Sequence, residues 1–334
     1  MKFSKIFSDQ LDHCYAIMRL QALDRDFIIV ASEENQPCYA YDLDNHFKKT
    51  TVWSTVGGTM TLVPLPGSLN FLATQKFYPG FNSRHCRIVK ETFNGTGWDQ
   101  TVIGEFPYIH RFDLIPQPES GAYWYVGCSI ANSKKFTDDW SDPGKVWVGT
   151  YDDEQAKLTN LRALPIRITK NHGYHRMAGY SLITGAEGIF RLDYPSQTSD
   201  WHLQQLAQKE TSDIAAADIN GDGQLEYLAI EGFHGSRLRM YDANFNSVAT
   251  SKFATPFGHA IWGGKIAGRD YFLFGWRAEK QGLELIKDLQ LDATLIGEHL
   301  GPSNVTVFAK NKQQYLLSAN REANEVAVYQ ISTK

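Results

Sequence analysis

The chain has 334 residues, of which 43% are hydrophobic and 13% aromatic, so it can bury a large core in one or two domains. Its 33 Lys and Arg against 37 Asp and Glu give a net charge of −4, and the basic residues form no run. The sequence also has no apolar run long enough for a transmembrane helix and no apolar core of signal-peptide length near its start. We therefore expect a cytoplasmic protein that binds neither nucleic acid nor membranes.

Seven strand-like runs recur along the chain at intervals of 38 to 65 residues. They begin at His13, Thr59, His110, His175, Asp213, His259 and Asn304. Each run is followed by a strongly apolar segment such as YFLFGW, by an alternating one such as GLELIKD, and by a polar one such as DWHLQQL. This order and spacing predict one propeller blade per interval, with four strands whose burial decreases outward from a central axis.

The last interval contains only three such segments, the third of them ending near Ile331. The segment KFSKIFS, residues 2–8, has the polar character of a fourth strand and precedes the first run. Pairing it with the last segment leaves no open sheet edge. We therefore predict an all-β, seven-bladed β-propeller whose ring is closed by the N-terminal strand, as a single domain over residues 1–334.

The four cysteines lie in apolar, strand-like segments and form no CxxC pair. These residues are Cys14, Cys38, Cys86 and Cys128. Two close thiol pairs would be typical of a zinc site, and conserved spacing in a small secreted domain would be typical of disulfides. The pattern here favours buried free thiols.

The segment DINGDGQLEY, residues 218–227, carries oxygen side chains at alternate positions followed by glycine. Asp218, Asn220, Asp222 and Glu226 are candidate ligands of a structural Ca²⁺, and a metal-free turn rich in Asp and Asn is the alternative. The segment resembles the FG-GAP/VCBS-type repeat of β-propellers, which implies a hairpin between the first two strands of a blade. An EF-hand is excluded because position twelve of the loop is Ala229.

Histidine stands at the head of four of the seven first strands, at positions 13, 110, 175 and 259. In a propeller these heads converge around the axial channel, so His13, His110, His175 and His259 are expected to ring its mouth. Neutral imidazoles there suit Mn²⁺, Fe²⁺ or Zn²⁺. The alternative is that single histidines act as acid or base toward a bound substrate.

Cationic and aromatic side chains follow the second strands and occupy the long connections at the same end of the blades. The candidate substrate-binding residues are Lys76, Arg84, Trp140, Arg176, His234, Arg277 and Arg321. Arginine suits a carboxylate, and flat aromatic surfaces suit sugar rings. A small acidic saccharide is the expected ligand, and β-elimination next to its carboxylate is the expected chemistry.

The stretches NSRHCRI, PYIHRFD and NHGYHR are similar to the His, His, Tyr, Arg constellation of seven-bladed propeller lyases that cleave uronate linkages. The chain also resembles the propeller portion of aldos-2-ulose dehydratases. The resemblance implies charge neutralisation or proton transfer by His85 and His110, proton transfer by Tyr174, and carboxylate binding by Arg176. His175 is a further acid–base candidate, and a histidine-ligated Mn²⁺, as in oligogalacturonate lyases, fits the axial histidines.

Two other functions remain open at this point. A propeller can be a rigid disc that binds a glycan or a protein without catalysis, because fold does not determine function. A glycoside hydrolase needs a pair of facing carboxylates, which Glu33, Glu187 and Glu231 can supply.

Overall fold

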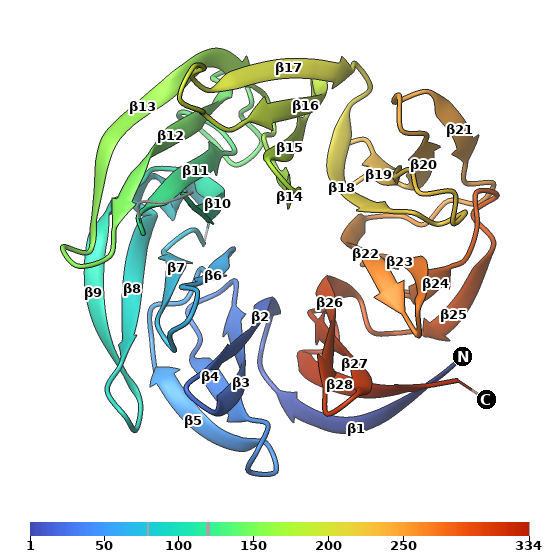
Figure 1. Cartoon of the computed structure of the whole chain (residues 1–334), viewed down its shortest axis with the longest axis horizontal. Coiled ribbons are helices and arrows are strands. Elements are labelled where there is room, and N and C mark those ends of the chain that lie inside the picture. The colour runs from blue at the N-terminus through green and yellow to red at the C-terminus, as the bar shows by residue number, and fades with distance from the viewer. Residues whose placement is uncertain (79, 118–120, 334) are drawn as a thin grey trace. The chain divides into compact units, whose positions relative to one another are not determined.

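The structure is a computed structural model that describes residues 1–78, 80–117 and 121–333, without the side chains of residues 80 and 81. The described chain forms seven antiparallel four-stranded sheets and one short 3-10 helix, η1 (Gly80–His85) (Figure 1). By its contacts the chain divides into two compact units, residues 10–171 and residues 1–9 with 172–334, and each is described by itself. The prediction of a single domain stays a prediction.

The unit of residues 10–171 contains three sheets, each built from four strands consecutive in sequence. The first comprises β2 (Cys14–Ala22), β3 (Arg25–Ser32), β4 (Cys38–Asp42) and β5 (Lys48–Trp53). The second comprises β6 (Leu62–Pro64), β7 (Phe71–Gln75), β8 (Arg87–Phe93) and β9 (Trp98–Glu105). The third comprises β10 (Ile109–Pro116), β11 (Tyr123–Ser129), β12 (Gly144–Asp152) and β13 (Lys157–Ile168).

The other unit contains four sheets, drawn from yellow-green to red in Figure 1, with β1 in blue. The first two comprise β14 (Gly173–Arg176), β15 (Tyr180–Gly185), β16 (Gly188–Asp193) and β17 (His202–Ala207), then β18 (Thr211–Ala217), β19 (Glu226–Glu231), β20 (Arg237–Tyr241) and β21 (Ser247–Thr250). The third comprises β22 (Gly258–Ile266), β23 (Arg269–Trp276), β24 (Leu283–Ile286) and β25 (Ala293–Gly297). The last comprises β26 (Pro302–Lys310), β27 (Gln313–Asn320), β28 (Glu325–Ser332) and β1 (Lys2–Gln10). All seven first strands begin within three residues of the predicted positions.

Burial follows the predicted gradient across each sheet. The second strands are almost wholly buried, as in β7 and β19, whereas the fourth strands β5, β21 and β25 are mostly exposed or half-buried. Apolar side chains of neighbouring sheets pack against each other. One such cluster joins Leu228 and Met240 to Phe272 and Ile286 of the following sheet. Face-to-face packing explains why the second strands are continuous apolar runs instead of alternating ones.

Strand β1 pairs with β28 at the outer edge of the last sheet, which confirms the predicted role of the N-terminal segment (Figure 1). Phe3 packs against the core cluster that contains Leu316, Ala327 and Tyr329. Lys5 forms an ion pair with Glu325, with Nζ 2.7 Å from Oε1. Without β1, strand β28 would present an unpaired edge.

The four cysteines are buried and free, as predicted. Burial raises the pKa of the Cys128 thiol to about 12, so this thiol stays protonated and unreactive at neutral pH. In the described part of the chain, no helix has the length and apolar composition that crossing a membrane requires.

Candidate functional site

A β-bulge interrupts the ladder at the head of the first strand in five of the seven sheets. The register shifts at Cys14/Ala16, Ile109/Arg111, Thr211/Ile214, Gly258/Ala260 and Pro302/Asn304. The residues inside the bulges include His110, Ser212, His259 and Ser303. A bulge re-aims a side chain and frees a backbone carbonyl from the ladder. In four of the five bulges the inserted residues are polar, and in the first sheet the inserted residue is Tyr15.

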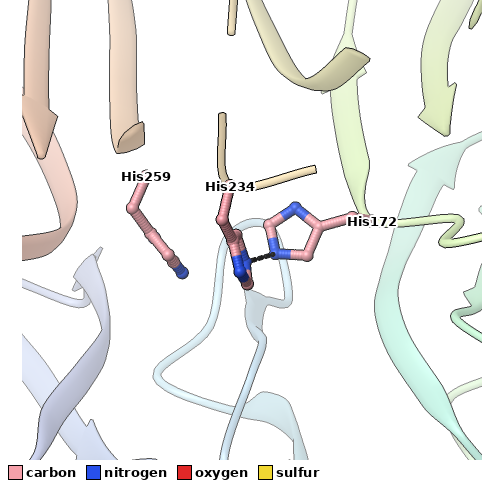
Figure 2. Close-up of side chains that lie close together, drawn as sticks. All are labelled: His172, His234 and His259. Atoms are coloured by element: carbon pink, nitrogen blue, oxygen red, sulfur yellow. Dashed lines mark hydrogen bonds between the residues drawn. The ribbon is translucent and has the colours of Figure 1, made fainter. Parts of the chain in front are cut away.

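Three histidines of the unit that contains residues 172–334 lie together (Figure 2). His172 precedes β14, His234 lies in the connection between β19 and β20, and His259 is the second residue of β22. The first strands β14, β18 and β22 contact one another in series, which gathers the residues at their heads. His172 and His259 are buried, and His234 is half-buried. We call these residues the three-histidine cluster.

The Nδ1 atoms of two cluster members are held by backbone carbonyls. His172 Nδ1 lies 3.1 Å from the carbonyl oxygen of Ser212, and His259 Nδ1 lies 2.8 Å from that of Ser303. Each serine is the bulge residue of the next sheet. A carbonyl oxygen only accepts hydrogen bonds, so both Nδ1 atoms carry a proton, and in a neutral ring this leaves the lone pair on Nε2. Metal-binding histidines are oriented by the same kind of bond.

The cluster geometry is close to that of a metal centre. One ligand nitrogen of each histidine lies within 4.8 Å of the other two, and the Nε2 atoms of His172 and His234 are 3.3 Å apart, joined by the hydrogen bond that is dashed in Figure 2. Two nitrogens bound tetrahedrally about 2.0–2.1 Å from a zinc ion are roughly 3.4 Å apart. The third nitrogen would have to move by on the order of 1 Å to reach the same separation. Three neutral imidazoles suit Zn²⁺, Fe²⁺ or Mn²⁺ and leave further coordination positions open.

Aromatic rings fix the orientation of His234. Its ring stacks against Phe233 and Phe257, with centroid separations of 4.1 and 4.5 Å, and lies 26° from parallel to the ring of His259. The guanidinium of Arg277 lies 4.8 Å from the centroid of Phe257. Phe257 remains 37% exposed, so an apolar ring borders the cluster on the accessible side.

His175 is not among the three clustered histidines. It lies on β14 opposite Leu182, and burial lowers its pKa to about 4. The ring is therefore neutral at pH 7. Of the four histidines predicted as metal ligands, His259 belongs to the cluster, and His172 takes the place beside it that the sequence pattern gave to His175.

The other predicted residues of this unit have partners within the protein. Arg277 Nε and Arg321 Nη1 share the carboxylate of Glu322, at 2.8 and 3.0 Å. The Tyr174 hydroxyl lies 2.7 Å from Ser181 Oγ. Arg176 is exposed at the end of β14. The Glu322 carboxylate partly offsets the positive charge of both guanidinium groups, and each arginine keeps further N–H donors for a substrate carboxylate.

The remaining predicted residues belong to the unit of residues 10–171. His13 precedes β2, and the buried ring of His110 packs edge-on against Phe77 at 5.3 Å. The ring of Trp140 is covered by the ammonium of Lys134, 3.3 Å from its centroid, so that face is not free to stack on a sugar. The meeting of His13 and His110 with His175 and His259 stays a prediction.

Three basic residues singled out in the sequence lie in the connection between β7 and β8. Lys76 and His85 line a common cavity, and Arg84 does not. The sequence pattern grouped Lys76, Arg84 and His85, but only Lys76 and His85 share a cavity.

The predicted calcium loop joins β18 and β19, as expected for the hairpin. Its oxygen atoms accept hydrogen bonds within the loop. Asp218 receives the backbone amides of Gly221 and Gly223, and Glu226 receives that of Ile219. Burial raises the pKa of Glu226. These bonds build a turn that is complete without a cation, and calcium at Asp218, Asn220, Asp222 and Glu226 stays a prediction.

His175→Gln should reduce the loss of stability in acid. Between about pH 6.5 and pH 4 the unfolded chain binds a proton that the folded protein excludes, so the wild-type free energy of unfolding falls as the pH falls. Removing the imidazole should abolish about 2 kcal/mol of this dependence. Urea unfolding at pH 7 and pH 4.5 measures it, with the exposed His202→Gln as control. An equal pH dependence in His175→Gln and the wild type contradicts the prediction.

The fold matches a known propeller. The WD40 beta propeller domain of Doa1 is similar over 99% of this chain and 97% of that chain, with a TM-score of 0.62 and 12% sequence identity. No protein-family model matches the sequence, and no curated protein does. Together with the seven four-stranded sheets, this likeness shows an all-β, seven-bladed β-propeller, as predicted. It shows the fold alone, so function is argued from the cluster.

Proposed function

We propose that this protein is a divalent-metal-dependent carbon–oxygen lyase that acts by β-elimination on a small acidic saccharide. The three-histidine cluster is the observation that supports the proposal. Its neutral donors and its open coordination positions are typical of catalytic metal centres, because structural zinc sites are closed by four protein ligands. The resemblance to uronate lyases and aldos-2-ulose dehydratases supplies the reaction class.

The reaction needs stabilisation of negative charge next to a carboxylate. A base removes the proton on the carbon next to the carboxylate, the carbon–oxygen bond at the neighbouring carbon breaks, and its former substituent leaves as an alcohol after taking up a proton. A divalent ion bound to the carboxylate supplies positive charge where the negative charge develops. His172 and His259 would hold the ion through Nε2, with Ser212 and Ser303 fixing the two rings.

Residues of the same unit have distinct roles in this proposal. Phe257 is 37% exposed beside the cluster and supplies the apolar contact for the sugar in this proposal. Tyr174, two residues beyond His172, is the proton-transfer group that the lyase resemblance implies, and its hydroxyl is linked through Ser181 to Tyr194. Glu231 suits a hydrolase acid poorly, because Lys209 and Arg239 bind it and its pKa is lowered.

The activity test measures the unsaturated product. Protein loaded separately with Mn²⁺, Zn²⁺ or Fe²⁺ is incubated with oligogalacturonate, oligoglucuronate or alginate fragments, and the ultraviolet absorbance of the conjugated product is followed. We expect activity with at least one combination, and a loss of roughly 100-fold or more in kcat/KM in His172→Ala and His259→Ala. Absence of product with every metal and uronate class contradicts the lyase proposal, and so does full activity in metal-free protein.

A second candidate function is glycan or protein binding without catalysis. Similarity to a WD40 beta propeller domain favours it, since it requires nothing beyond a rigid scaffold. In that case metal binds the cluster but no product forms, and the His172→Ala variant keeps its affinity for the partner. Three further points belong to the proposal and are compatible with either function. They are the FG-GAP/VCBS-type resemblance of the β18–β19 hairpin, a bound Ca²⁺ in that hairpin, and a cytoplasmic location.

A further inference from the structure

The unit of residues 10–171 contains a cavity of about 510 Å³ that uses none of the three clustered histidines. It is formed by the β3–β4, β5–β6 and β7–β8 connections. The polar side chains that line it are Asn35, Thr55, Lys76, Tyr78, Asn82 and His85. Cavities of roughly 300–1,000 Å³ hold small-molecule ligands, so this volume suits a monosaccharide or a disaccharide.

Backbone hydrogen bonds hold the three connections together. The amide of Gly58 donates to the carbonyl of Glu34 at 3.0 Å, and the amide of Lys76 donates to that of Gly57 at 2.8 Å. A Cβ atom at Gly57 would lie within the radius of the Glu34 oxygen, so only glycine permits this approach. The walls of the cavity are therefore fixed before any ligand binds, which lowers the entropic cost of binding.

Two lining residues adopt unfavourable backbone conformations. Val56 has φ +69° and Lys76 has φ +62°, and a β-branched residue is rarely found in the left-handed region. Each such residue costs on the order of 1–3 kcal/mol, so the surrounding contacts must hold it in place. Other turns of the chain contain the same conformation, for example at Leu23 and Asn311, so it describes the lining and does not by itself mark a ligand site.

The chemistry of the lining selects an anion that also carries hydroxyl groups. Lys76 and His85 are the ionisable bases, and the described residues of the lining include no carboxylate. Within the described residues, neither of them forms an ion pair with Asp or Glu. The carboxamides of Asn35 and Asn82 both donate and accept hydrogen bonds, as neighbouring sugar hydroxyls require, and Tyr78 adds a partly exposed ring.

We propose that this cavity binds the carboxylate and hydroxyl groups of a sugar acid, with Lys76 at the carboxylate and Asn35 and Asn82 at the hydroxyls. A single lysine favours a singly charged carboxylate over a phosphate, which is commonly held by several cationic or amide donors. The site goes beyond the proposed function, because binding here requires neither a metal nor the three-histidine cluster.

The test is isothermal titration calorimetry with sodium D-glucuronate in the presence of EDTA, with D-glucose as the uncharged counterpart and inorganic phosphate as a simple anion. We expect glucuronate to bind with a Kd on the order of 1 mM and glucose at least tenfold more weakly. Lys76→Gln should weaken glucuronate binding about tenfold. Arg84→Gln is the matched control, because Arg84 lies in the same connection, is exposed and does not line the cavity. It should leave the Kd unchanged.

Each outcome decides the proposal. Equal binding of glucose, equal or tighter binding of phosphate, an equal loss in Arg84→Gln and Lys76→Gln, or no binding of glucuronate at all would overturn it. Should Lys76→Gln melt at a lower temperature than the wild type, Asn35→Ala in the neighbouring connection provides the second variant. Glucuronate binding that persists in His172→Ala, without product formation by the wild type, would reject the lyase and retain this site.

Discussion

Replacing any member of the three-histidine cluster with alanine should lower the affinity for Zn²⁺ or Mn²⁺ by roughly 100-fold or more. Loss of a residue that only orients a ligand typically costs 10–100-fold, so loss of a ligand should cost at least as much. When the free metal concentration is about 100 times the Kd, the free energy of unfolding of the wild-type protein should increase by about 2.7 kcal/mol. This increase should raise the Tm by several degrees. His172→Ala, His234→Ala and His259→Ala should lose both effects. Affinity should also fall as the pH is lowered, because protons compete for the imidazole nitrogens.

His202→Ala is the matched control for the metal experiment, because the His202 side chain is 67% exposed on β17 and lies outside the cluster. Its metal affinity and its metal-induced change in Tm should equal those of the wild type. His172 and His259 are buried, so the melting temperature of each metal-free variant must be measured beside its affinity. A variant that folds like the wild type and still binds the metal with wild-type affinity rejects that histidine as a ligand.

Deleting residues 2–9 should leave the protein unfolded or aggregated at 25 °C. The deletion removes almost all of β1 and turns β28, with Val326 and Val328 fully buried, into an unpaired apolar edge. It also removes Phe3 from its cluster, a loss worth about 3–5 kcal/mol for a buried phenylalanine and less for this partly buried one. The loss of the strand pairing adds to this, and a typical protein is stabilised by only about 5–15 kcal/mol. Far-UV circular dichroism and size-exclusion chromatography measure the outcome.

Lys5→Ala is the control for the deletion, since it keeps the strand and removes only side-chain interactions, the partly exposed ion pair with Glu325 and the contact of the ammonium with the Tyr329 ring. Such a pair is worth about 1 kcal/mol or less, so Lys5→Ala should fold and melt close to the wild type. A monomeric deletion variant with the wild-type melting curve would show that β1 contributes little to the last sheet.

The repeat could be predicted from the sequence because it is set by the order of apolar and polar residues within each strand. Four strands in each interval, with the second continuously apolar and the fourth polar, follow from how deeply each strand is buried. The contribution of residues 2–8 to the last sheet was predictable for the same reason, as was the burial of the four cysteines. The hairpin at residues 218–225 was predictable from its glycines and acidic side chains.

The sequence pattern also placed histidines at the heads of first strands, but it could not choose among them. His172 and His175 are three residues apart in NHGYH, and the pattern alone favoured His175 as the first residue of the strand. Strand β14 begins at Gly173, which leaves His172 in front of it, where its Nδ1 meets the Ser212 carbonyl. A one-position difference in register decides which side of a sheet a side chain enters, and long-range pairing fixes that register.

The apolar and polar periodicity, on its own, determined the number of sheets, their strand order and the closing strand. The reason is that the depth at which a strand is buried constrains the polarity of that strand's own residues. Tertiary structure decided the contents of the site. The bulges that free the carbonyls of Ser212 and Ser303, the approach of His234 from a connection 62 residues beyond His172, and the sharing of one cavity by Lys76 and His85 all depend on contacts between segments distant in sequence. Such contacts produce no periodic pattern in the sequence, so the sequence alone does not predict them.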